Sequence, residues 1–256
     1  MINVKSKSEL EKMRLAGKIS ANALHYGGQS IRVGMSTYEL DKIIHDYIVK
    51  NGAKPNFLGY GGFPGSACIS INNKVIHGIP SKHEFIQDGD IVSIDTGACI
   101  DGFNGDNAYT FAVGNVSEEA RQLLRVTEES LYKAIDQAVV GNRIGDISHA
   151  VEEHVTSYGY GVVKQYVGHG VGASLHESPE IPNFGKPGRG PRLVAGMTLA
   201  IEPMINAVGE EVKVLPDGWT VLTKSGSLSA HFEHTVAITS DGPVILTKPT
   251  IISGGR

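Results

Sequence analysis

The sequence has 256 residues, of which 41% are hydrophobic and 20% charged, the proportions of an ordinary soluble globular protein. A formal net charge of -4 without a basic tract excludes general attraction to nucleic acid. Two cysteines exclude a disulfide scaffold and favour a reducing compartment, so we expect a cytoplasmic protein. No stretch approaches the roughly 20 apolar residues of a membrane span. Charged residues also interrupt the first ten positions, where a secretory signal needs an apolar run.

Two helices are predicted at the start of the chain, each opened by a capping box. Residues 6–9 are Ser-Lys-Ser-Glu and residues 36–39 are Ser-Thr-Tyr-Glu, a spacing that lets both side chains cap the first turn. Apolar residues at helical spacing follow each box. Gly52 is a plausible stop for the second helix.

Strands are predicted next, because the helical spacing of the apolar residues ends and β-branched residues accumulate after residue 65. The predicted strands are residues 67–71, 91–100 and 103–113. Asp101-Gly102 between the last two is a hairpin signal. Helical pattern returns over residues 117–140 and 144–156, with a break at Gly141-Asn142. Further strands are expected near residues 160–166, 197–204, 219–223 and 233–239, with a long proline- and glycine-rich loop at 179–191.

The order helix, helix, strands therefore occurs twice. It predicts an α+β fold in which two similar halves surround one antiparallel sheet, with the helices outside. We expect a single domain over residues 1–256, with halves of roughly 1–114 and 115–256. No residue repeat accompanies this symmetry, which follows from element order alone.

The predicted hairpin brings two acidic side chains together. A two-residue turn places Asp95 opposite Ala108 and Asp106 opposite Gly97, so the two aspartates become diagonal neighbours on one face. Carboxylates on adjacent strands repel each other unless a proton or a cation lies between them. A metal ion is the economical explanation, and a solvated hairpin carrying surface acids is the alternative.

Other acids and histidines extend this set. Glu202 and Glu233 lie in apolar, strand-like surroundings, and buried acids need partners. His77, His169 and His176 lie next to glycines or in a glycine-rich segment, where the backbone can approach a ligand, although a lone histidine is more often a surface residue. An oxygen-rich set with few imidazoles and no thiolate fits catalytic Mn, Fe, Co or Zn. Two such ions sharing carboxylates suit amide hydrolysis.

At this point the sequence resembles a known family, the type I methionine aminopeptidases of peptidase family M24 in their short bacterial form. Six motifs in family order carry the resemblance: His77-Gly-Ile-Pro, Ile94-Asp95 with Gly105-Asp106, Gly168-His169-Gly-Val-Gly, Leu175-His176-Glu, Ile201-Glu202-Pro and Phe232-Glu233-His-Thr. The resemblance covers nearly the whole chain. It implies the pita-bread fold, which agrees with the two halves expected above.

The resemblance also implies roles for the metal ligands. Asp95 is expected to hold one divalent ion, Asp106 and Glu233 to bridge two ions, and His169 and Glu202 to complete the ligands of the other ion. The implied mechanism is attack of a metal-bridging hydroxide on the carbonyl of the first substrate residue, with Glu202 as proton shuttle. The free α-amine of the substrate is anchored at the metals, which makes the enzyme an exopeptidase.

Residues outside the metal shell receive roles by the same resemblance. His77 and His176 are expected to contact the substrate amine region and the scissile carbonyl. The methionine pocket is expected to use Tyr60, Phe63, Cys68, Leu175 and Trp219, with core packing as the even alternative for Trp219. Backbone carbonyls near Asn72, Lys74 and Ser229 are the expected ligands of a monovalent cation, as in relatives.

The implied function is removal of the initiator methionine from nascent proteins whose second residue is small. Ribosome contact fits this function, and we expect a monomer. One alternative is a proline-specific peptidase of the same fold, which carries a large preceding domain, whereas here the first capped helix begins after Ser6. The other alternative is a non-catalytic peptide-binding protein on this scaffold. The presence of all five expected metal ligands argues against it.

Overall fold

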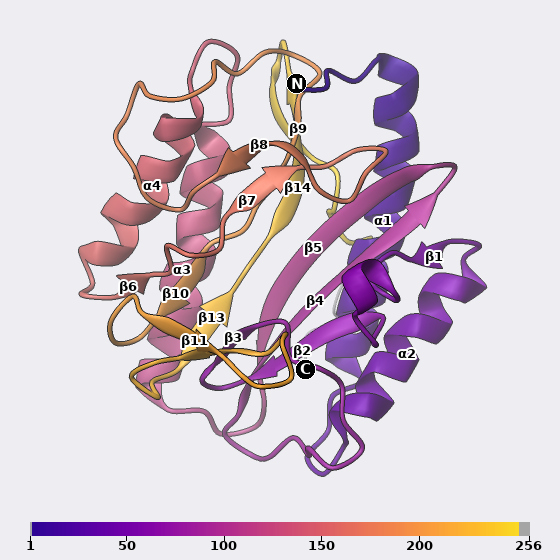
Figure 1. Ribbon diagram of the computed structural model, residues 1–256, viewed down its shortest axis with the longest axis vertical. Helices are drawn as coiled ribbons and strands as arrows, with labels where there is room; N and C mark the ends of the chain where they lie inside the picture. Colours follow the sequence, from indigo (N-terminus) through magenta and orange to yellow (C-terminus); the bar gives the residue numbers. More distant parts are fainter. Residues whose placement is uncertain (1, 251–256) are drawn as a thin grey trace.

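The computed structural model describes residues 2–250, so residue 1 and residues 251–256 of the expected domain lie outside the described part. Helices α1 and α2 lie on one side of the molecule and α3 and α4 on the opposite side, with the strands between them (Figure 1). The α-helices of this span are α1 (Lys7–Gln29), α2 (Thr37–Lys50), α3 (Glu118–Asp136) and α4 (Ile144–Thr156), and a 3-10 turn, η1, covers Tyr60–Gly62.

The predicted helix starts are confirmed. Ser6 and Ser36 are the N-caps of α1 and α2, and both capping boxes are formed by reciprocal serine and glutamate hydrogen bonds. Gly52, just past α2, adopts a positive φ of 79° as expected for a helix stop. The prediction for α3 was too long, because α3 ends at Asp136 and the chain then turns toward Leu193, which accepts a hydrogen bond from the Gly141 amide.

Short antiparallel strands form the layer between the helix pairs. They are β1 (Lys54–Pro55), β2 (Ala67–Ile71), β3 (Lys74–Ile76), β4 (Ile91–Ile100), β5 (Phe103–Ala112), β6 (Gly161–Val162), β7 (Gly168–Gly170), β8 (Glu177–Ile181), β9 (Thr198–Ile201), β10 (Met204–Asn206), β11 (Val212–Val214), β12 (Val221–Thr223), β13 (Ser229–His231), β14 (His234–Thr239) and β15 (Gly242–Ile245). The two main groups are β1-β4-β2 with β5 on β4, and β15-β14-β9-β7-β8. Strands β13-β10-β6 and β11-β12-β3 form smaller sheets.

The register of the β4–β5 hairpin is the one predicted. Asp95 pairs with Ala108 and Asp106 with Gly97, and the turn at residues 101–102 closes the hairpin. Adjacent side chains alternate between faces, so this register places both aspartates on the same face of the sheet. The structure therefore confirms the predicted pairing that makes Asp95 and Asp106 diagonal neighbours.

Hydrogen bonds across the middle of the molecule join the two halves. The Thr235 hydroxyl donates to the Asp106 carbonyl at 2.8 Å, and the Glu233 amide donates to the Ala108 carbonyl at 2.9 Å. The Thr110 hydroxyl donates to the carbonyl of His231 at 2.8 Å. Strand β5 of the first half is thus fixed against β13 and β14 of the second.

Each helix pair covers its own apolar core. Helices α1 and α2 pack on β2 and β4 through buried residues that include Leu24, Leu40, Ile44, Ile69 and Ile94. Helix α3 packs on β9, β10 and β13, and α4 packs on β6 and β8. The second core between them includes Leu123, Val151, Leu199, Phe232 and Val236. Burial of apolar area is the main stabilising contribution in both halves. No helix within residues 2–250 has a stretch long and apolar enough to cross a membrane.

Two predictions in the second half need correction. The strand expected at residues 160–166 is limited to the two residues of β6, because pairing with β10 stops at Val162. The long loop begins after Ile181 and not at Pro179, because β8 continues to Ile181 in its pairing with β7. Strand β7 itself was not predicted, since a Gly-His-Gly segment has no β-propensity of its own and becomes a strand through its neighbours β8 and β9.

Candidate functional site

One cavity contains every side chain that the sequence selected. Its lining includes the twelve predicted site residues, Tyr60, Phe63, Cys68, His77, Asp95, Asp106, His169, Leu175, His176, Glu202, Trp219 and Glu233. Phe57, Ile76, Tyr166 and Val167 also line it and were not predicted. Ile76 and Val167 lie within two residues of predicted histidines, so the motif positions already pointed to their neighbourhood.

The polar end of the cavity is built from strands of both halves. Asp95 lies on β4 and Asp106 on β5, His169 is the middle residue of β7, Glu202 follows β9 directly, and Glu233 lies between β13 and β14. The hairpin, β7, β9 and β14 belong to different parts of the chain, and only the assembled sheets bring these side chains together. Strand alternation directs Asp95 and Asp106 to one face, and the side chains from the other segments meet them in the cavity.

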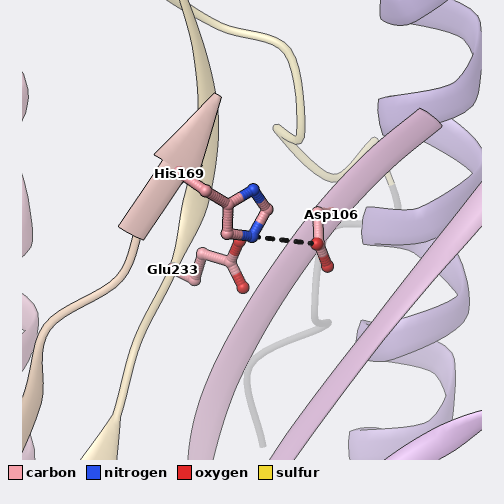
Figure 2. A group of neighbouring side chains, drawn as sticks. All are labelled: Asp106, His169 and Glu233. Carbon is pink, nitrogen blue, oxygen red and sulfur yellow. Dashed lines mark ion pairs between the residues drawn. The ribbon is translucent and has the colours of Figure 1, made fainter. Parts of the chain in front are cut away.

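Three of these side chains converge closely. One ligand atom each from Asp106, His169 and Glu233 lies within 4.8 Å of the others, and all three residues are buried. Figure 2 shows the imidazole of His169 directed between the two carboxylates. Its Nε2 lies 3.8 Å from Asp106 Oδ2 and 3.5 Å from Glu202 Oε1. These atoms could act as ligands of a single cation.

The carboxyl groups are in an environment that disfavours their charge. Burial raises the pKa of Asp106 to about 7. Burial, reinforced by the neighbouring carboxylates, raises the pKa values of Asp95, Glu202 and Glu233 well above their ordinary range. Buried oxygens of Asp95, Asp106 and Glu233 accept no hydrogen bond from the protein. An oxygen-rich group of this kind fits divalent metal ions, which satisfy the oxygens and compensate the charge.

The hydrogen bonding of His169 prepares it as a ligand. Its Nδ1 lies 2.8 Å from the carbonyl oxygen of Gly170. A carbonyl can only accept, so Nδ1 carries the hydrogen and Nε2 presents a lone pair to the carboxylates. Burial lowers the pKa of His169 to about 4, which keeps the ring neutral near pH 7. A backbone carbonyl that fixes the tautomer in this way is typical of metal-binding histidines.

The other two predicted histidines border the same cavity. His77 lies edge-on to Tyr166 and to Trp219, with ring centroids 5.7 Å and 6.2 Å away. Burial and the neighbouring His176 lower the pKa of His77 to about 4. His176 is exposed, and its Nδ1 lies 2.8 Å from the hydroxyl oxygen of Tyr60. Both rings are therefore available to contact a bound molecule.

An apolar pocket adjoins the polar end. Phe57, Phe63, Cys68 and Leu175 form a buried cluster, against which Trp219 packs as a partly buried side chain. The ring of Phe63 meets that of Trp219 edge-on at 5.2 Å between centroids. Such a pocket accommodates an unbranched apolar side chain such as a thioether. Phe57 was missed because the other pocket residues were taken from the family resemblance, and no signal in the sequence around Phe57 distinguishes it from a core residue.

His231 is a further neighbour of the site that the sequence reasoning missed. Its side chain is 2% exposed, and its Nε2 lies 3.7 Å from Glu202 Oε2. Burial and the neighbouring His77 lower the pKa of His231 to about 3. A signal was available, because His231 precedes Glu233 by two residues, and alternation along a strand places such residues on one face.

Comparison with known proteins agrees with this geometry. The pattern of "Metallopeptidase family M24" matches residues 11–240. The methionine aminopeptidase of Clostridium acetobutylicum is 54% identical over 96% of this chain and 99% of its own length. That of Clostridium perfringens is 55% identical over the same shares. The crystal structure of methionine aminopeptidase from Thermotoga maritima superimposes with a TM-score of 0.95 at 48% identity, covering 97% of this chain and 100% of that one.

Fold and site together define a metallopeptidase with the pita-bread fold, in which two similar halves form a curved antiparallel sheet with helices outside. Divalent metal ions are the cofactors of this class. The chain belongs to metallopeptidase family M24 and, within it, to the methionine aminopeptidases of the short bacterial form.

Proposed function

We propose that this protein is a methionyl aminopeptidase that removes the N-terminal methionine of nascent proteins when the second residue is small. The observation that carries the proposal is the union, in one cavity, of a buried acid and histidine group with a pocket of apolar side chains. The first can bind hydrolytic metal ions, and the second can bind a methionine side chain. Full-length similarity to methionine aminopeptidases favours this activity over a proline-specific peptidase.

Two divalent ions, Co, Mn, Fe or Zn, are proposed as cofactors. Asp95 would bind one ion, His169 and Glu202 the other, and Asp106 and Glu233 both. The oxygens of this group without protein partners support the assignment. Ions bound there supply Lewis acidity toward the scissile carbonyl and activation of water. A monovalent cation is proposed separately at backbone carbonyls near Asn72, Lys74 and Ser229.

The side chains of the protein would bind and orient the substrate and move protons. Glu202 would act as the proton shuttle, because its carboxyl lies in the cavity beside His169 and His231, with its oxygens 3.5 Å and 3.7 Å from their Nε2 atoms. With the Tyr60 hydroxyl donating to Nδ1 of His176, the Nε2 hydrogen of His176 can be donated to the scissile carbonyl oxygen. His77 would contact the amine end of the substrate. Phe63 and Trp219 would hold the methionine side chain.

The setting follows from the substrate. Nascent chains are produced by ribosomes, so we propose a cytoplasmic enzyme that acts near the ribosome, as a monomer formed by a single domain. A non-catalytic binding protein is the remaining alternative, and an assay of metal-dependent peptide cleavage distinguishes it from an enzyme.

The test compares two aspartates of the same hairpin. Asp106→Ala should abolish both metal binding and cleavage of the peptide Met-Ala-Ser, measured by calorimetric titration and by product release. The control, Asp101→Asn, changes an exposed aspartate at the turn, where φ is 52° and asparagine is tolerated, and should leave both unchanged. Undiminished cleavage by Asp106→Ala would refute the assignment. Failure of the unmodified protein to cleave with any of Mn, Fe, Co or Zn would favour the binding protein.

A further inference from the structure

A buried ion pair lies behind the turn that carries His176. Lys5 Nζ is 2.6 Å from Glu177 Oε2, and the two side chains are only 5% and 7% exposed. Neither residue lines the cavity. Burying two charges costs desolvation free energy, and an apolar pair of similar size is often at least as stable. The pair is therefore poorly explained by stability alone.

Glu177 uses both carboxylate oxygens to hold the turn. Oε1 accepts a hydrogen bond from the Ser174 amide at 3.2 Å, while Oε2 accepts from Lys5 and, at 3.1 Å, from the side-chain amide of Asn3. Hydrogen bonds from Lys5, Ser174 and Asn3 outweigh the effect of burial, and the pKa of Glu177 lies below its ordinary value. Glu177 is therefore a carboxylate at neutral pH, and the pair is charged.

Asn104 holds the other side of the same turn. Its side-chain amide donates to the carbonyl oxygens of Gly172 and Ala173 at 2.9 Å and 3.1 Å. Within the turn, the Gly172 amide donates to the Ser174 carbonyl at 3.0 Å. Residues 172–177 thus have fixed attachments to β5 on one side and to the N-terminal segment on the other.

Lys5 is itself rigidly placed. Its backbone amide donates to the carbonyl of Gly196 at 2.7 Å, immediately before the capped start of α1. Its side chain fits tightly under the turn, since a Cβ atom added to Gly172 would lie 2.5 Å from both Lys5 Cε and Glu177 Oε1. Lys5 is therefore held at its backbone amide and along its side chain, and its ammonium can fix the position of Glu177.

The turn presents two cavity residues, Leu175 and His176, immediately before Glu177. We propose that Lys5 and Glu177 are positioning residues of the active site, whose ion pair uses the N-terminal segment to set the placement of His176 and Leu175. This inference rests on the proposed function, in which His176 contacts the scissile carbonyl. Small displacements of such a contact reduce catalysis strongly, on the order of a hundredfold for about 1 Å.

The first experiment breaks the pair in the metal-loaded enzyme. Lys5→Met should lower kcat for Met-Ala-Ser by about tenfold or more, while the metal dissociation constants measured by calorimetry stay within about twofold of the unmodified protein. Lys164→Met is the matched control, because it breaks an equally short but exposed pair with Glu210, whose side chains are 42% and 51% exposed. The control should retain full activity. Full activity of Lys5→Met would overturn the inference.

A double-mutant cycle then tests the route of the effect. In a His176→Ala background, Lys5→Met should reduce kcat by less than about twofold, since His176, the positioned group that contacts the scissile carbonyl, is gone. Fully additive losses would overturn the inference. If His176→Ala has full activity, both the proposed role of His176 and the positioning role are overturned. If His176→Ala is impaired but Lys5→Met is fully active, the positioning role alone is overturned.

A second variant separates positioning from folding. Lys5→Met/Glu177→Leu replaces the ion pair by apolar side chains and should recover the melting temperature lost in Lys5→Met, because no unpaired charge remains buried. Its kcat should remain at least about tenfold below that of the unmodified enzyme, because Ser174 has lost its acceptor. Joint recovery of stability and activity would show a structural role only and would overturn the inference.

Discussion

Removal of the metal ions should make the stability of this protein decrease as the pH rises from 6.5 to 8. Burial raises the pKa of Asp106 to about 7 in the folded state, against an ordinary value of 3.8. Above pH 6 the unfolded chain has released this proton while the folded chain still binds it. The stabilising contribution is fully present below about pH 4 and is lost as the pH rises through the folded value.

The magnitude follows from the shift. Between pH 6.5 and 8, a pKa of about 7 for Asp106 corresponds to a loss of about 1 kcal/mol. Asp95, Glu202 and Glu233, whose pKa values burial raises well above their ordinary range, act in the same direction. Buried histidines act in the opposite direction within the same interval, because their unfolded side chains still bind protons near the ordinary value of 6.5 whereas the folded rings, with pKa values of about 4, do not. His77 and His169 each add less than about 1 kcal/mol of stability between pH 6.5 and 8, which is smaller than the combined loss from the four acids.

Urea unfolding in the presence of a chelator measures the effect directly. The midpoint should fall from pH 6.5 to 8 at constant m-value, and added divalent metal should stabilise the protein most at pH 8, where the carboxylates are free of protons. Asp106→Asn removes one titrating group and should flatten the slope. If the free energy of unfolding of the metal-free protein stays constant or rises over this pH interval, the buried carboxyl groups do not have raised pKa values and the reasoning is refuted.

Three substitutions test other parts of the structure. Gly105→Ala places a Cβ in van der Waals overlap with the backbone of Gly17 in α1, so we expect a loss of at least about 1–3 kcal/mol; unchanged thermal stability would contradict this close packing. Trp219→Ala removes the edge-on partner of Phe63 and should lower kcat/KM for methionyl peptides by about tenfold or more, and an unaffected value would assign the tryptophan to core packing. Ser117→Ala removes the side-chain cap of α3 and should cost about 1 kcal/mol in chemical unfolding with no change in activity.

Local sequence signals predicted those parts of the fold that depend on local interactions. The capping boxes at Ser6 and Ser36 set the helix starts, and the turn Asp101-Gly102 set the register that brings Asp95 near Asp106. In these segments the hydrogen-bonding partners lie within a few residues of each other or across one tight turn. Prediction from the chain alone is therefore reliable there.

The remaining parts depend on partners distant in sequence. Strand β7 around His169 exists because it pairs with β8 and β9. The position of His231 beside Glu202 follows from the pairing of β13 with β10, in which His231 lies opposite Met204. The pair of Lys5 and Glu177 joins residues 172 positions apart. Side-chain type did indicate the candidate metal ligands, because buried acids require compensation, but it could not indicate which distant residues support them.

The candidate metal ligands are divided between the two halves, with Asp95 and Asp106 on the first hairpin and His169, Glu202 and Glu233 on the second set of strands. Neither half alone can assemble the complete group. During synthesis, the chain acquires its full set of ligands only after Glu233 has been added and β14 has docked on β5. Metal binding would then require that the two halves have assembled, and a bound ion would stabilise their association.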